Sequence, residues 1–157
     1  MIKNSRLKTA AEIFNADFQY AKMQSVKQAV PVFLVSTGTG ATWCYGISNT
    51  AACNCTVTDT TNAAACTIWE DVDKDLVQDA NENMLKVTTS ASFNNIELES
   101  QSFGATGITF SPINATAENG NFTFTNNAGS LRVVTTLLGR SRYCTVDYAW
   151  GGYDQCE

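Results

Sequence analysis

Five carboxylates recur at regular spacing near the middle of the chain. Counted from the first of them, they occupy positions 1, 3, 5, 9 and 12 of a loop: Asp71, Asp73, Asp75, Asp79 and Glu82. An EF-hand loop wraps Ca²⁺ in oxygen ligands with this spacing. Position 6 is Leu76, however, where the sharp turn of such a loop calls for glycine, and no clear helical pattern flanks the loop. We therefore interpret the loop as a solvated acidic connection between strands, and calcium binding is the alternative.

Arginines near the C-terminus form a second candidate site. Arg132 lies within a β-branched run, Arg140 and Arg142 follow the run, and no acidic residue lies between positions 131 and 142. In an extended segment Arg140 and Arg142 project from the same side. Adjacent guanidinium groups bind phosphates, so these three arginines are the candidate DNA-binding residues. The alternative is a solvated arginine pair whose charge protects an edge strand from aggregation.

The chain has six cysteines and no histidine, which excludes zinc sites of the Cys/His type and favours disulfides over free buried thiols. We expect Cys144 to pair with Cys156, and the other four cysteines to pair among themselves: Cys44, Cys53, Cys55 and Cys66. A Cys53–Cys55 bridge is not expected, because so short a loop strains the bond. Disulfides indicate an oxidising compartment such as the periplasm or the cell surface.

The same lack of histidine bears on catalysis. Nucleophile and general-base arrangements need histidine, or a cysteine or carboxylate with an activating partner. The chain has no glycine-rich phosphate loop, and no sugar-binding pattern supports its carboxylates as a glycosidase pair. We predict a non-enzymatic protein without a cofactor or a resident metal, and an unrelated secreted enzyme is the alternative.

A long helix and a series of short strands must position these residues. No Gly or Pro occurs from Ile2 to Ala29, and apolar residues recur on one helical face: Leu7, Ala10, Ala11, Phe14, Phe18, Ala21 and Ala29. Pro31 should end this helix. Short β-branched and aromatic runs separated by turn residues then predict strands: 32–35, 84–88, 96–98, 107–110, 122–124, 131–138 and 143–146.

These elements predict a single α+β domain over residues 1–157. An amphipathic helix at 1–30 packs on an antiparallel β-meander within a β-rich head at 31–157, which carries a Cys-rich insert at 44–66. Positions 70–82 hold six of the 15 acidic residues and one lysine, so this loop accounts for the whole net charge of −5 and a local basic site is still possible.

The expected export of the protein conflicts with the sequence at the start of the chain, which shows no export signal. No stretch reaches the roughly 18 apolar residues needed to cross a bilayer, and no signal-peptide core follows Met1. A chain with oxidised cysteines must nevertheless leave the cytosol. We therefore expect the sequence to be trimmed of its targeting segment.

Two segments resemble the FimU/FimT/GspH family of type IV pilin-like minor pilins. The first is the helix, with Arg6-Leu7 followed by an Ala21-Lys22 pair and Ser25-Val26-Lys27. The second comprises the closing strands, which end in Gly139-Arg140-Ser141-Arg142, similar to the family's "Gly-Arg-x-Arg" signature. Trp69 and the acidic loop through Leu85 loosely match the family's middle stretch. The insert matches no known pattern.

The resemblance implies a pilin-like fold whose native precursor has an apolar N-terminal helix, a prepilin-peptidase site and a methylated N-terminus. Such a protein is anchored in the inner membrane, facing the periplasm, before it joins a pilus at the cell surface. The implied function is that of a minor pilin, which primes assembly with other minor pilins and the major pilin and sits in the tip complex. The alternatives are a FimT-like DNA-binding subunit for natural transformation and a GspH-like pseudopilin of type II secretion.

Overall fold

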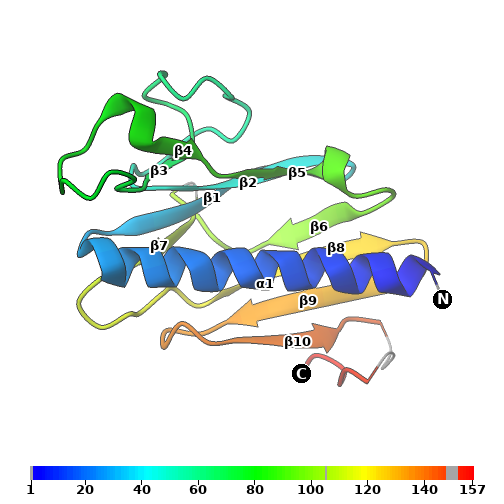
Figure 1. The fold of residues 1–157 in the computed structure, drawn as a ribbon. Helices are drawn as coiled ribbons and strands as arrows, with labels where there is room; N and C mark the ends of the chain where they lie inside the picture. The colour runs from blue at the N-terminus through cyan, green and yellow to red at the C-terminus, as the bar shows by residue number, and fades with distance from the viewer. Residues whose placement is uncertain (1, 105, 148–151) are drawn as a thin grey trace.

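The computed structural model describes residues 2–104, 106–147 and 152–157, and its elements are drawn in Figure 1. One long α-helix precedes ten strands and two short 3₁₀ helices, with these bounds: α1 (Ile2–Gln28), β1 (Val32–Thr39), β2 (Thr42–Ser48), β3 (Thr67–Trp69), η1 (Ala80–Glu82), β4 (Asn83–Leu85), β5 (Val87–Thr89), η2 (Ser90–Ser92), β6 (Glu97–Gln101), β7 (Ile108–Phe110), β8 (Gly120–Asn126), β9 (Gly129–Thr135) and β10 (Ser141–Thr145).

Helix α1 forms as its apolar periodicity predicted. Six residues of the expected face are buried: Leu7, Ala10, Ala11, Phe14, Phe18 and Ala21. Ala29 is an exception, because it lies just beyond the helix, is exposed and has a φ of 56°. A left-handed residue at this position is a common way to end a helix, and Pro31 prevents the helix from resuming.

The strands form two antiparallel four-stranded sheets and one two-stranded ribbon. The first sheet has the order β5-β2-β1-β7, the second has the order β10-β9-β8-β6, and β3 pairs with β4. Figure 1 shows α1 running along both four-stranded sheets, with β1 and β2 above it and β9 and β10 below. The α+β fold class is therefore confirmed, with the strands divided between two sheets.

Three details differ from the predicted strands. Strand β2, which contains Cys44, lies where the Cys-rich insert was expected to begin, and six of its seven residues are buried. Such burial on both faces leaves no alternating pattern to recognise. The run at 84–88 is two strands in different sheets, separated at Lys86, and β9 ends at Thr135, before the exposed Leu137 and Leu138.

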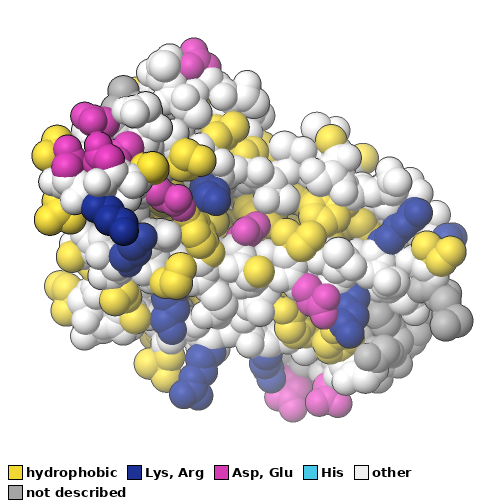
Figure 2. All heavy atoms as spheres, viewed as in Figure 1, with side chains coloured by type: hydrophobic (Ala, Val, Ile, Leu, Met, Phe, Trp, Pro, Cys, Tyr) yellow, Lys and Arg dark blue, Asp and Glu magenta, His cyan; other side chains and the backbone are white. Residues whose placement is uncertain are grey.

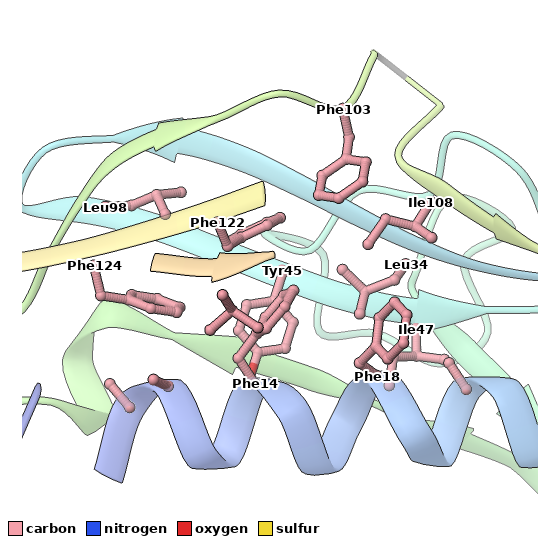
Figure 3. Close-up of a cluster of buried hydrophobic side chains, with 14 of the residues drawn as sticks. Phe14, Phe18, Leu34, Tyr45, Ile47, Leu98, Phe103, Ile108, Phe122 and Phe124 are labelled. Atoms are coloured by element: carbon pink, nitrogen blue, oxygen red, sulfur yellow. The ribbon is translucent and has the colours of Figure 1, made fainter. Parts of the chain in front are cut away.

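The core lies between α1 and the two four-stranded sheets and is rich in aromatic rings. Phe14 is fully buried, its ring stacks on that of Phe122 with centroids 4.3 Å apart, and it meets the edge of Tyr45 at 5.4 Å. Phe18 packs against Phe110 at 5.0 Å. Figure 3 shows both phenylalanines pointing from α1 toward the sheets. Aromatic pairs in such geometries add to the stabilisation from burial alone.

The six cysteines form three disulfides: Cys44–Cys55, Cys53–Cys66 and Cys144–Cys156. The first two hold the irregular segment after β2 together and to that strand, and their four cysteines pack with Val35 in a second small core. The third ties the C-terminal segment to β10. The pairing keeps the insert separate from the C-terminus, the arrangement that we expected from the spacing of the cysteines.

Candidate assembly and nucleic-acid interface

The candidate arginines lie on β9, on β10 and in the turn between these strands. Arg142 pairs with Val134 across the two strands, and Arg132 lies two residues before Val134 on β9. Directly paired residues and residues two apart on a strand share a face, so Arg132 and Arg142 lie on the same face of the sheet. The alternate residues Leu131 and Val133 are fully buried in the core. The arginine face is therefore the outer one.

The three arginines differ in how free their side chains are. Arg132 is half-buried, and its Nε donates a hydrogen bond of 3.0 Å to Thr123 Oγ1 on β8. Arg140 and Arg142 are exposed. Among the residues that the structure describes, the single ion pair joins Lys8 and Glu12, so neither of these arginines has an acidic partner there. Their guanidinium groups are available to a phosphate or to another subunit.

The turn that carries Arg140 is fastened to α1. Lys22 Nζ donates hydrogen bonds to the carbonyl oxygens of Leu138, at 3.2 Å, and Gly139, at 3.4 Å. Gln19 Nε2 also donates to the Gly139 carbonyl, at 3.4 Å. Gly139 has a φ of 65°, and a Cβ at this position would lie 2.9 Å from the Lys22 side chain. The left-handed backbone favours glycine here, and an added Cβ would also push the flexible end of the Lys22 side chain aside.

Both segments joined by these hydrogen bonds carry exposed apolar side chains. Met23 and Val26 on α1 are 56% and 51% exposed, and Leu137 and Leu138 in the turn are 57% and 65% exposed. A shallow groove on α1 is lined by Gln19, Lys22, Met23, Val26 and Lys27. We call the set formed by Lys22, Met23, Val26, Leu137, Leu138 and Arg140 the α1–turn surface. Apolar patches rimmed by charge are typical of protein interaction sites.

Charge is distributed unevenly over the molecule. Figure 2 shows acidic side chains gathered at upper left, over the connection between β3 and β4, whereas basic side chains are spread across the face, some of them on the lower side. The acidic connection contains Glu82, which is 2% exposed. The Trp69 indole Nε1 donates a hydrogen bond of 2.9 Å to Glu82 Oε2, and this bond lowers the pKa of the carboxyl. The acidic loop is thus organised by its own hydrogen bonds.

The contact between Lys22 and the Gly139 turn was not foreseen from the sequence. Lys22 and Leu138 are 116 residues apart, and no local periodicity relates them. Only the combination of the helix motif and the "Gly-Arg-x-Arg" motif in one family resemblance pointed to both segments. These residues combine positive charge with exposed apolar area, which suits binding to another protein or to a phosphate.

A long N-terminal helix on antiparallel sheets, fastened to a Gly-Arg turn, is a pilin-like arrangement. The chain matches the model of the family described as type II transport protein GspH over residues 10–139. The chain belongs to the GspH family. No curated protein and no solved structure gave a significant match.

Membership in the GspH family places the protein among pilin-like subunits of type II secretion systems or type IV pili. Such subunits are typically structural and interact with other pilins or pseudopilins in a pilus-like assembly of the cell envelope. No helix among the described residues is both long and apolar enough to cross a membrane. The matched region includes most of α1, strands β1 to β9 and the turn up to Gly139, and it ends before Arg140 and β10.

Replacing Gly139 with alanine should destabilise the turn and its contact with α1. A left-handed backbone with a side chain costs about 1–3 kcal/mol, and the added Cβ must also displace Lys22. We expect a loss of about 2 kcal/mol in the free energy of unfolding, measured by urea denaturation. The matched control is Gly104→Ala, because nothing lies within 4 Å of a Cβ at that position. Equal stability of the two variants would contradict the described turn.

Proposed function

We propose that this protein is a minor pilin of a type IV pilus, a non-enzymatic subunit that primes assembly with other minor pilins and the major pilin and sits in the tip complex. Membership in the GspH family supports the class of assembly. The α1–turn surface is the observation that carries the proposal, since it exposes four large apolar side chains beside Lys22 and Arg140. Pilin subunits join through such unlike surfaces, which generate a helical fibre in place of a closed ring.

In this proposal the native precursor is anchored in the inner membrane, exposes its disulfide-bonded head to the periplasm, and has a methylated N-terminus after processing. It then moves into the pilus at the cell surface. The disulfides support an oxidising location. The alternative is that the protein is a GspH-like pseudopilin of a type II secretion system, a subunit with the same architecture.

The proposal is tested in cells that lack the gene and are complemented with variants of the native protein. Met23→Asp/Val26→Asp places two carboxylates on the α1–turn surface and should reduce the number of surface fibres at least tenfold. The control is Ile113→Asp, which alters a side chain that is 87% exposed in the loop between β7 and β8. Normal fibres together with loss of exported proteins would assign the subunit to type II secretion. Normal fibres and normal export would contradict both roles.

Binding of DNA for natural transformation is the second candidate function, favoured by the exposure of Arg140 and Arg142 without acidic partners. If the surface neutralises two to four phosphates, the logarithm of the binding constant should fall with the logarithm of salt concentration at about −0.9 per phosphate. The net charge of −5 predicts weak binding, near the weak end of about 10⁻⁴–10⁻⁶ M.

The variant Arg140→Gln/Arg142→Gln distinguishes the two functions. If DNA is bound there, this variant should flatten the salt dependence and abolish transformation while fibre number stays normal. The matched control is Lys3→Gln/Arg6→Gln, which removes two exposed positive charges from the N-terminal end of α1. Unchanged transformation with fewer fibres would confine these arginines to assembly.

A further inference from the structure

The connection between β3 and β4 folds its carboxylates toward one another. Ligand oxygens of Asp71, Asp73 and Glu82 all lie within 4.8 Å of one another, and those of Asp73, Asp75 and Asp79 form a second such group. Asp73 belongs to both groups, so the two groups are adjacent. The only basic residue between Asp71 and Glu82 is Lys74. Like charges this close repel one another unless a cation lies between them.

The Glu82 side chain and one oxygen of the partly buried Asp71 are removed from solvent. Asp71 Oδ1 is buried and accepts no hydrogen bond from any described residue. Glu82 is 2% exposed, and its oxygens accept hydrogen bonds from Trp69 Nε1 and from the backbone nitrogens of Val72 and Asp79. A buried carboxylate oxygen without a donor is costly, because it loses its water and gains nothing in return. A bound cation would satisfy Asp71 Oδ1.

The loop backbone resolves one of the two objections that the sequence raised against ion binding, the absence of glycine at position 6. Leu76, at the position where glycine was expected, has a φ of 63°, so the chain makes the left-handed turn without glycine. The Leu76 backbone nitrogen donates to Asp71 Oδ2 at 3.3 Å, which closes the loop on its first carboxylate. The loop thus wraps round its own acidic residues.

We propose that residues 71–82 bind a Ca²⁺ ion through the carboxylates of Asp71, Asp73 and Glu82, with those of Asp75 and Asp79 in the adjacent group. Calcium takes six to eight oxygen ligands at about 2.3–2.6 Å, so ligands on opposite sides of the ion lie about 4.6–5.2 Å apart. Within each group of three carboxylates the separations of no more than 4.8 Å fit this geometry. Magnesium requires a smaller octahedral shell and keeps several waters, so a flexible loop with five carboxylates favours calcium. The inference is independent of the proposed role in pilus assembly.

Terbium luminescence tests the site directly, because Tb³⁺ occupies calcium sites and is excited by a nearby indole. Trp69 is hydrogen-bonded to Glu82, so titration of the metal-free protein with Tb³⁺ should give saturable luminescence that Ca²⁺ displaces. We expect a dissociation constant for Ca²⁺ on the order of 10⁻⁴ M, as in extracellular calcium modules, and at least tenfold weaker competition by Mg²⁺. Millimolar CaCl₂ should also raise the melting temperature above that in a chelator.

Asp73→Asn is the decisive variant, since Asp73 belongs to both groups and is exposed, so the protein should still fold. It should weaken Ca²⁺ binding at least tenfold and remove the shift in melting temperature. The matched control, Glu97→Gln/Glu99→Gln, removes two exposed carboxylates from β6 and should bind Ca²⁺ as the parent does. Binding by Asp73→Asn equal to that of the parent, or a parent melting temperature that Ca²⁺ leaves unchanged, would overturn the proposal.

Discussion

Replacing Phe14 with alanine should lower the free energy of unfolding by about 3–5 kcal/mol, enough to unfold much of a domain of ordinary stability. Phe14 is fully buried and contacts three rings, those of Tyr45, Phe122 and Phe124. Truncation removes the transfer free energy of the ring and leaves a cavity where α1 meets both sheets. Urea denaturation followed by circular dichroism measures the loss.

Met23→Ala is the matched control, because Met23 lies on the same helix with 56% of its side chain exposed. A surface substitution of this kind should change stability by no more than about 0.5 kcal/mol. Phe18→Ala, which removes the contact with Phe110, should resemble Phe14→Ala. Melting of either phenylalanine variant at the parent temperature would place this helix face outward and contradict the fold.

Removal of the Cys53–Cys66 disulfide should have the second largest effect, a loss of about 2–4 kcal/mol. The bridge closes a loop with a sequence separation of 13, and the segment it holds contains no regular strand or helix. Without the bridge, the unfolded chain gains conformational freedom, and the small core of four cysteines and Val35 loses its link. The variant Cys53→Ala/Cys66→Ala, compared with the parent by thermal and urea unfolding, measures the effect.

Peptide mapping without reduction provides the control for that experiment. Peptides joined as Cys44–Cys55 and Cys144–Cys156 should persist in the variant, which shows that the loss arises from one bridge alone. A parent-like unfolding transition in the variant, or a peptide that joins Cys144 to the insert, would contradict the described arrangement.

Local patterns were sufficient for the parts of the fold that are amphipathic. Helix α1 alternates a buried and a solvated face, so its periodicity predicted Phe14 and Phe18 in the core and Pro31 beyond its end. Strand β2 is buried on both sides and follows no such pattern. The division into two sheets was likewise hidden, because pairing such as β1 with β7 depends on contacts between distant segments.

In the candidate site, too, features set by neighbouring residues could be predicted, whereas features set by contacts between distant segments could not. The two-residue spacing of Arg140 and Arg142 was visible in the sequence, but the shared face of Arg142 and Arg132 follows from the register of β9 and β10. The fastening of the Gly139 turn by Lys22 joins the two ends of the chain and has no local signal. In the acidic loop, the spacing of the carboxylates was visible, whereas the left-handed turn at Leu76 was not.

The central claim is that the α1–turn surface joins this GspH-family protein to other pilin-like subunits. Site-specific photo-cross-linking in cells tests it most directly, with the photoreactive residue at Val26 or Leu138 and a control at the exposed Glu99 on β6. We expect cross-links from Val26 and Leu138 to other pilin-like subunits and none from Glu99. A normally produced protein that forms no such cross-link from either position would contradict the claim.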